Sequence, residues 1–213
     1  MGRPKTVKED TETSVETAIS DNTEKNNAIK KKIEKQYGDV FLSPKFILDK
    51  KRSIISVSPK LDIALNGGIA SGSWGIISGK PKLGKTLTSL KIIANAQKEG
   101  FRAYYFDIEN RLRKKNLTGI PELDLSEDKL QIVTSTKGNI LTAEKNLEIA
   151  ESLLKNEERI IIVLDSTSAL CPNKEYDAEI SGQGRSESPR LLATFTRKLA
   201  NIVSVQDSII ILL

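Results

Sequence analysis

The chain has 213 residues, of which 29% are charged and 5% are aromatic, and its formal net charge is +5 at pH 7. It contains no histidine and one cysteine, Cys171, which excludes histidine-based catalysis, most zinc sites and an intrachain disulfide. No apolar run approaches the roughly 20 residues that span a bilayer, and the polar N-terminus lacks the apolar segment of a signal peptide. We therefore expect a cytoplasmic protein without a membrane role, whose basic charge permits a polyanionic partner.

The first part of the chain is expected to lie outside the main core. Residues 1–27 are rich in Thr, Glu, Asp, Ser, Lys and Asn and predict a disordered polar arm. Apolar residues spaced by fours predict a short helix over 28–37, and strand-like pieces follow at 46–48 and 54–57. We interpret residues 28–58 as an N-terminal helix and strand segment.

Residues 79–86 read Gly-Lys-Pro-Lys-Leu-Gly-Lys-Thr and fit the phosphate-binding pattern G-x-x-x-x-G-K-[ST]. An apolar strand predicted over 74–78 precedes them, and an amphipathic helix predicted over 85–98 follows, which is the setting that the pattern requires. Lys85 would reach the β- and γ-phosphates of a nucleotide and the Thr86 hydroxyl would bind Mg²⁺, although a surface turn rich in Gly and Lys is the alternative. The predicted nucleotide-binding residues are Gly79, Lys80, Pro81, Lys82, Leu83, Gly84, Lys85, Thr86 and Leu87.

Around this loop, strands and helices alternate to the end of the chain. Unbroken apolar strands in such an alternation predict a parallel sheet that is covered on both faces, and therefore an α/β fold. We find no internal repeat. A helical turn is expected at 61–65, further strands over 103–106, 130–133, 160–164 and 208–213, helices over 142–155 and 189–203, and loops at 111–115 and 172–188.

Two carboxylates follow predicted strands at the edge where α/β sheets bind ligands. Asp165 ends an unbroken apolar strand and would hold Mg²⁺ through water, although Asp is also a common cap of turns and helices. Glu109 follows the strand over 103–106 and could orient and deprotonate the water that attacks the γ-phosphorus. Taken alone, Glu109 would belong to a solvated loop.

Several spaced segments together resemble the RecA-type DNA recombinases, including their phage relatives. The resemblance covers nearly everything after residue 30, and its segments occur in the order of the family. They are Ile33–Gly38, Leu61–Leu65, the phosphate loop, Ala96–Gly100, Asp107–Glu109, Leu164–Ser166 and the stretch from Leu170 to Ala200.

The resemblance implies a RecA-like P-loop NTPase fold with ATP and Mg²⁺ as cofactors. It implies a DNA-dependent ATPase that coats single-stranded DNA as a homo-oligomeric filament and pairs it with homologous duplex DNA during recombinational repair of DNA damage. The cytoplasm of a bacterium or of a phage-infected host would be its location. Glu109 and Lys85 would be the catalytic residues, and Thr86 and Asp165 would hold the metal. Residues 28–58 would dock on a neighbouring protomer.

The resemblance also implies a first DNA-binding loop over 176–188, followed by basic residues on a helix. The alternative to DNA contact is that the arginines lie on a solvated helix face, which is the usual place for arginine. The predicted DNA-binding residues are Ile180, Ser181, Gly182, Arg185, Arg190 and Arg197.

The chain departs from the family in three places. The interior of the phosphate loop, residues 80–83, is more basic and bulkier than usual, and residues 110–115 do not show the family's aromatic that stacks on adenine. The family's second DNA-binding loop and γ-phosphate sensor would follow the strand over 208–213. We therefore expect an ATPase core over 59–213 that is incomplete at its C-terminus, as the N-terminal part of a longer or split recombinase. Two other functions stay open: a regulatory ATPase of the RecA superfamily without strand exchange, and a truncated, non-enzymatic filament-interaction module.

Overall fold

The computed structural model describes residues 25–179 and 187–213, and the chain divides into two units, residues 1–51 and 52–213. In the first unit residues 25–37 are helical, which confirms the helix predicted over 28–37. The strand predicted over 46–48 is wrong, because these residues lie in helix α2 (Pro44–Asp49). A proline in the first turn favours helix initiation, and the Phe46 N–H donates to the Ser43 carbonyl at 3.0 Å. Local bonds of this kind close a turn, whereas a strand depends on a paired neighbour.

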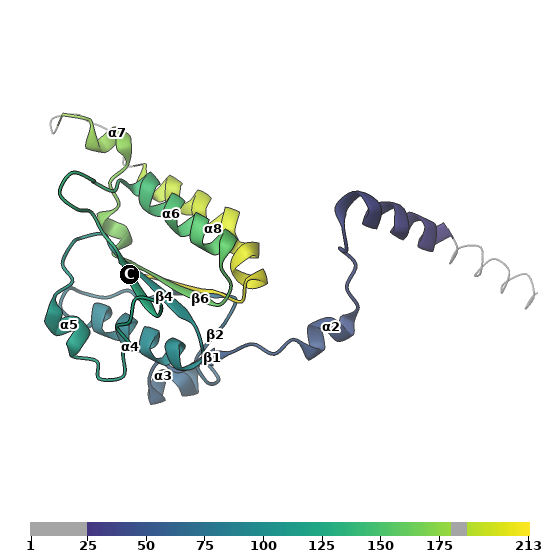
Figure 1. The fold of residues 1–213 in the computed structure, drawn as a ribbon, viewed down its shortest axis with the longest axis horizontal. Helices are drawn as coiled ribbons and strands as arrows, with labels where there is room; N and C mark the ends of the chain where they lie inside the picture. The colour runs from purple at the N-terminus through teal and green to yellow at the C-terminus, as the bar shows by residue number, and fades with distance from the viewer. Residues whose placement is uncertain (1–24, 180–186) are drawn as a thin grey trace, which may run out of the picture. The chain divides into compact units, whose positions relative to one another are not determined.

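The second unit is built around a five-stranded sheet in which every neighbouring pair is parallel (Figure 1). This confirms the predicted α/β fold with a parallel sheet. The strand order is β3-β7-β6-β4-β5. The strands are β3 (Ser73–Ile76), β4 (Arg102–Asp107), β5 (Leu130–Val133), β6 (Ile160–Asp165) and β7 (Ile209–Leu212).

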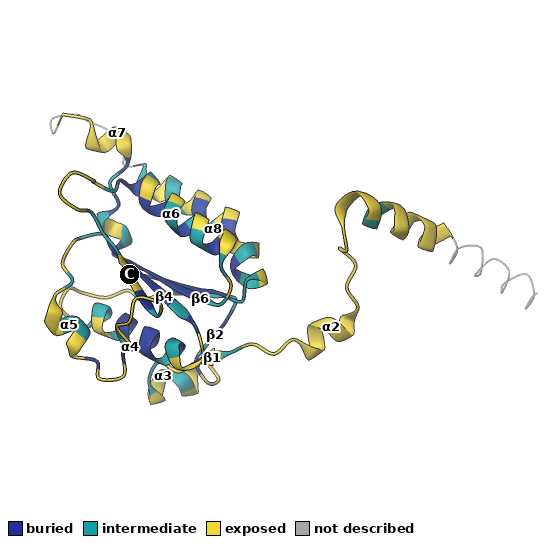
Figure 2. Cartoon of the chain, viewed as in Figure 1, coloured by how far each residue is buried: buried dark blue, intermediate teal, exposed yellow. Residues whose placement is uncertain are grey.

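Helices cover both faces of the sheet (Figure 1). Helix α4 (Lys85–Lys98) lies on one face, and helices α6 (Ala143–Asn156) and α8 (Ser188–Val205) lie together on the other. Successive residues of a strand point to opposite faces, so Tyr105 joins the core on the α4 side and Tyr104 the core on the α6 and α8 side. Figure 2 shows the resulting burial of the sheet and of the inner helix faces. This double cover explains why these strands are almost entirely apolar.

The last strand, β7, lies between β3 and β6, the place that the resemblance to the RecA-type recombinases implies for residues 208–213. Ile210 pairs with Trp74 on one side and with Ile162 on the other. Because the strands are parallel, the carboxyl ends of β3, β4 and β6 meet at the same edge of the sheet. The loops that follow these three strands carry the candidate site.

Short elements connect this framework, and the sequence predicted only part of them. Strand β1 (Ile54–Ile55) is shorter than the strand predicted over 54–57, and it pairs antiparallel with β2 (Ile69–Ala70), which was not predicted. Gly68 allows this pairing, since a Cβ there would lie 2.2 Å from the Ile55 carbonyl oxygen. Helix α5 (Lys114–Thr118) begins within the loop predicted at 111–115, and helix α7 (Asn173–Tyr176) lies within the loop predicted at 172–188. The short elements are β1 (Ile54–Ile55), α3 (Pro59–Ala64), β2 (Ile69–Ala70), α5 (Lys114–Thr118), the 3₁₀ helix η1 (Thr167–Ala169) and α7 (Asn173–Tyr176).

Candidate nucleotide-binding site

The predicted phosphate loop connects β3 to the first turn of α4, in the strand–loop–helix order that the pattern requires. Gly84 precedes the helix with φ of 88°, a left-handed conformation that glycine adopts without the penalty of a side chain. The Lys85 ammonium donates to the carbonyl oxygens of Gly79 at 2.9 Å and Lys80 at 3.3 Å, so the loop wraps around this side chain. The first N–H groups of a helix lack helical acceptors and sit at the positive end of its dipole. The loop therefore offers a lysine and backbone donors to an anion.

Thr86 and Asp165 meet at the edge of the sheet although they come from distant parts of the chain. The Thr86 hydroxyl donates to Asp165 Oδ2 at 2.7 Å. The same carboxylate oxygen accepts a hydrogen bond from the hydroxyl of Tyr105, a fully buried residue of β4. Burial, and then the hydrogen bond to Asp165, raise the pKa of Tyr105 far above its ordinary value, so this hydroxyl stays a neutral donor. The carboxylate is thus held from two sides.

Glu109 lies in a loop that β4 and β6 hold in place. Asp107 is buried, and its carboxylate accepts hydrogen bonds from the Arg111 and Leu112 N–H groups at 2.9 and 2.8 Å. The Ile108 N–H donates to the Asp165 carbonyl at 2.9 Å. These bonds fix the backbone on both sides of Glu109.

The Glu109 carboxylate itself has two side-chain partners. Its Oε1 accepts a hydrogen bond from the Ser166 hydroxyl at 2.7 Å, and its Oε2 forms an ion pair with the Arg111 guanidinium at 2.6 Å. The Arg111 side chain is 80% exposed and the Glu109 side chain 27%, so solvent screens this pair and it contributes little to stability. Glu109 is therefore anchored by Ser166, next in the chain to Asp165, and remains accessible to a small molecule.

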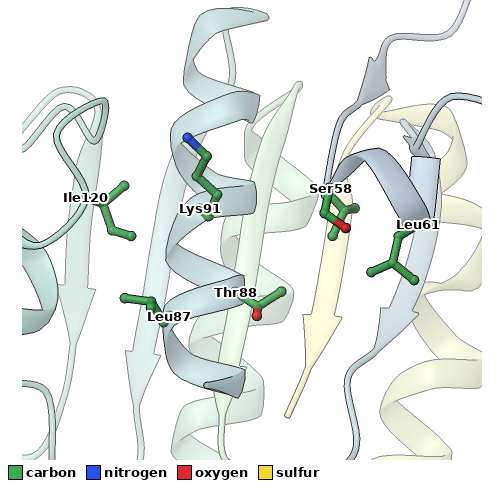
Figure 3. A pocket seen from close by; sticks show the side chains of 7 residues that line it. Ser58, Leu61, Leu87, Thr88, Lys91 and Ile120 are labelled. Carbon is green, nitrogen blue, oxygen red and sulfur yellow. The ribbon is translucent and has the colours of Figure 1, made fainter. Parts of the chain in front are cut away.

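An apolar hollow of about 330 Å³ lies beside the phosphate loop, along the outer side of α4 (Figure 3). Leu87, included in the predicted nucleotide-binding set, is half exposed and lines this hollow. The other lining residues are Val57, Ser58, Leu61, Thr88, Lys91 and Ile120.

The donor set at Thr86 and Asp165 fits Mg²⁺. Hydroxyl and carboxylate oxygens are ligands of hard cations, and Mg²⁺ in nucleotide sites is usually held by one or two such groups together with phosphates and water. Within residues 25–179 and 187–213, no group of three or more His, Cys, Asp or Glu side chains forms an all-protein metal cage. Thr86 and Asp165 would be the chain's own contribution to such a site.

The predicted DNA-binding residues are only partly within the described chain. Arg190 and Arg197 are exposed on α8, about two helical turns apart and hence on the same side of the helix. The Arg197 Nε donates to the Ala193 carbonyl at 3.2 Å, a bond within its own helix. Ile180, Ser181, Gly182 and Arg185 lie outside the described residues.

Three residues at the site were not singled out from the sequence: Tyr105, Ser166 and Arg111. Tyr105 occurs within an apolar strand, where a tyrosine usually indicates core. Strand alternation places Tyr105 and Asp107 on the same side of β4, but it does not reveal the contact with Asp165 on the neighbouring strand. Ser166 follows Asp165 directly, and Arg111 follows Glu109 by two residues, so proximity in sequence was the available signal for both.

Comparisons with a family model and with individual proteins agree with each other. The sequence model of the family described as "RecA N-terminal domain" matches residues 24–213. The chain is 32% identical to the mitochondrial DNA repair protein recA homolog of Dictyostelium discoideum over 185 residues, which are 85% of this chain and 39% of that protein. It is 35% identical over 183 residues to Protein RecA of Clostridium tetani and 34% identical over 182 residues to that of Aquifex aeolicus, covering 84% of this chain and 50% of each relative. The chain thus spans half or less of the length of these relatives. Among the helices of the described residues, none has the length and apolar character to cross a membrane.

Proposed function

Since this chain belongs to the RecA family, we propose that it is an ATP-dependent DNA recombinase, or the N-terminal part of one. It binds single-stranded DNA as a filament of identical protomers in the cytoplasm and promotes homologous pairing and strand exchange in recombinational repair. The observation that carries the proposal is the 2.7 Å contact between the Thr86 hydroxyl and Asp165. This contact joins the phosphate loop to the acidic end of a central strand, the arrangement that nucleotide hydrolysis with Mg²⁺ requires.

The phosphate loop and Lys85 bind the nucleotide in this proposal. Backbone N–H groups at the start of α4 surround the phosphate chain, and Lys85 exchanges its carbonyl partners on Gly79 and Lys80 for phosphate oxygens. A phosphate oxygen offers the Lys85 ammonium a charged acceptor in place of a neutral carbonyl, which favours the exchange. The basic side chains of Lys80 and Lys82 add positive charge around the same loop.

Thr86 and Asp165 hold the metal, and Glu109 acts on water. Because the Thr86 proton points to Asp165, the hydroxyl lone pairs stay available for Mg²⁺, and Asp165 reaches the ion through water. When bound, Mg²⁺ neutralises charge on the phosphate oxygens. Glu109, anchored by Ser166, orients a water molecule toward the γ-phosphorus and takes its proton.

On the DNA side, we assign the phosphate contacts to arginines. Arg190 and Arg197 share one exposed side of α8, while Phe195 and Leu199 on the opposite side are buried in the core. Two cations on one exposed side suit the phosphates of a DNA strand. Ile180, Ser181, Gly182 and Arg185 complete the DNA-binding set, and residues 28–58 join neighbouring protomers.

The test is ATP hydrolysis with and without single-stranded DNA. Lys85→Ala is expected to weaken nucleotide binding, whereas Glu109→Gln is expected to keep binding and lose about 100-fold or more in turnover, the usual size of a general-base contribution. Lys98→Ala, on the exposed side of the same helix, and Glu127→Gln, an exposed carboxylate, are the matched controls and should leave both properties unchanged.

The outcome also separates the other two functions. Hydrolysis that depends on Lys85 and Glu109 but is not stimulated by DNA would favour a regulatory ATPase of the same superfamily. A folded protein that binds no nucleotide would favour a non-enzymatic filament-interaction module. Either result would overturn the proposal that this chain by itself acts as a recombinase.

A further inference from the structure

Tyr105 places a buried hydroxyl against the carboxylate that the proposed function assigns to the metal. The residue is fully buried in β4, and its hydroxyl donates to Asp165 Oδ2. We infer that Tyr105 is a positioning residue, whose hydroxyl orients the Asp165 carboxylate for Mg²⁺ binding. This inference rests on the proposed function, since it concerns the same site.

The strand register explains how Tyr105 reaches Asp165. Tyr105 pairs with Val163 on the neighbouring strand β6, and Asp165 lies two residues further along that strand on the same face. Diagonal neighbours of this kind lie within reach of a long aromatic side chain. Tyr105 therefore approaches Asp165 from within the sheet, whereas Thr86 approaches it from α4.

The two donors leave the carboxylate with one oxygen for the metal. Oδ2 accepts from both Thr86 and Tyr105, and no hydrogen bond from a described residue to Oδ1 is found. With Oδ2 occupied, the side chain has a defined orientation, and Oδ1 is left to accept from metal-bound water. Partners behind a metal-site carboxylate commonly fix its orientation in this way. Without the tyrosine hydroxyl, Thr86 alone would have to both hold the carboxylate and bind the ion.

Core stability alone does not account for a hydroxyl at this position. The ring lies in an apolar cluster with residues such as Leu90 and Ile93 of α4, which a phenylalanine ring would also fill. Burying a hydroxyl costs free energy unless it forms a hydrogen bond, so its use must be sought in its partner. That partner is the carboxylate of the proposed metal site.

The neighbouring tyrosine supplies a matched control. Tyr104 is 3% exposed on the opposite face of the same strand, and its hydroxyl donates to Glu157 Oε1 at 2.6 Å, at the C-terminal end of α6. Tyr104→Phe and Tyr105→Phe each remove one buried hydroxyl that is bonded to a carboxylate. They differ in whether that carboxylate belongs to the proposed site.

The experiment measures equilibrium binding of a fluorescent ATP analogue to the full chain, once with Mg²⁺ and once with EDTA. The ratio of the two affinities reports how strongly the metal supports nucleotide binding, independently of hydrolysis. In Tyr105→Phe we expect this ratio to fall about tenfold, the lower end of effects from residues behind metal ligands, with the affinity in EDTA unchanged. Tyr104→Phe should leave the ratio as in the unmodified chain, and Tyr105→Phe added to Asp165→Asn should cause no further loss.

Three outcomes would overturn the inference. The first is an unchanged ratio in Tyr105→Phe, and the second is an equal loss in both tyrosine variants, which would reflect general destabilisation. The third is a further loss in the Asp165→Asn background, which would mean that Tyr105 acts independently of Asp165. Failure of the proposed function looks different, because the unmodified chain itself would then bind no nucleotide with Mg²⁺, and the tyrosine inference would fall with it.

Discussion

Gly84 sets the backbone geometry of the phosphate loop. The effect of its left-handed backbone can be measured separately from the effect of added side-chain volume. Its φ is 88°, yet a Cβ added there would meet no atom within 4 Å. Gly84→Ala is therefore expected to destabilise the fold by about 1–2 kcal/mol through left-handed backbone strain alone. Urea unfolding at equilibrium would measure this change in the free energy of unfolding.

Gly79→Ala is the matched control for that substitution. Gly79 belongs to the same loop, a Cβ there would also meet nothing within 4 Å, and its φ is not in the left-handed region. We expect its effect to be within about 0.5 kcal/mol, as for other substitutions without a strained backbone. Equal effects of the two substitutions would contradict the assignment of the cost to φ at Gly84.

Among individual site residues, sequence reasoning succeeded where a local pattern determines the position. The glycine and lysine pattern placed Lys85 and Thr86 at the start of a helix, and the end of an apolar strand placed Asp165 at the same sheet edge. Tyr105 could not be found in this way, because its contact with Asp165 depends on the register between β4 and β6. That register results from side-chain contacts across the whole sheet, which no short sequence window contains.

At the next level, helices α6 and α8 are joined by a cluster of charges around Glu151. Its carboxylate pairs with Lys198 of α8 at 2.6 Å and with Lys155 of its own helix. Hydrogen bonds from Lys155 and then Lys198 hold the pKa of Glu151 below its ordinary value of 4.5. A group whose pKa is lowered on folding stabilises the protein above its unfolded pKa, and this stabilisation is lost as the pH falls through the folded pKa.

Glu151→Gln should therefore destabilise the chain in a pH-dependent way. At pH 7 we expect a loss of about 0.5 kcal/mol, since the lysines are largely exposed and solvent screens the pairs. The loss should shrink as the pH falls below the ordinary glutamate value. Urea unfolding across this pH range would measure it, with Glu148→Gln, an exposed glutamate of the same helix, as the control. A loss that stays constant with pH would contradict the electrostatic origin.

Most helices and strands of the second unit form where the sequence predicts them, and the exceptions have identifiable causes. The bounds predicted for α4 (Lys85–Lys98) and β5 (Leu130–Val133) are confirmed, because periodic apolar positions run to their ends. In the first unit, the error at residues 46–48 arose because three consecutive apolar residues suit a strand or a short helix equally. Strand β2 was missed because two residues carry no detectable period.

For the chain as a whole, the site depends on topology more than on any single segment. Lys85 follows the loop after β3, Glu109 lies in the loop after β4, and Asp165 ends β6, and these three strands come from well-separated parts of the chain. They meet only because the right strands become neighbours and β7 enters between β3 and β6. The parallel sheet was predictable from the alternation of strands and helices, whereas of the strand order only the place of the strand over 208–213 was expected, through the family resemblance.

The first unit presents apolar side chains that its own residues leave uncovered. Helix α2 contains no buried residue, and Phe46, Ile47 and Leu48 are 53%, 65% and 83% exposed. Burial of apolar area of this kind favours association at about 25 cal/mol per Å². The proposed role of residues 28–58 in joining protomers therefore predicts that the chain self-associates through these side chains.

The double variant Phe46→Ser/Ile47→Ser tests this expectation. Sedimentation over a range of concentrations should show association of the unmodified chain and a shift toward monomer in the double variant. Leu125→Ser, which removes a side chain of the second unit that is 48% exposed, is the control and should associate as the unmodified chain does. Because Phe46 and Ile47 lie outside the second unit, its free energy of unfolding should change by less than about 0.5 kcal/mol. If the double variant associates as strongly as the unmodified chain, the contacts between protomers lie elsewhere, and the assignment of residues 28–58 to protomer docking is wrong.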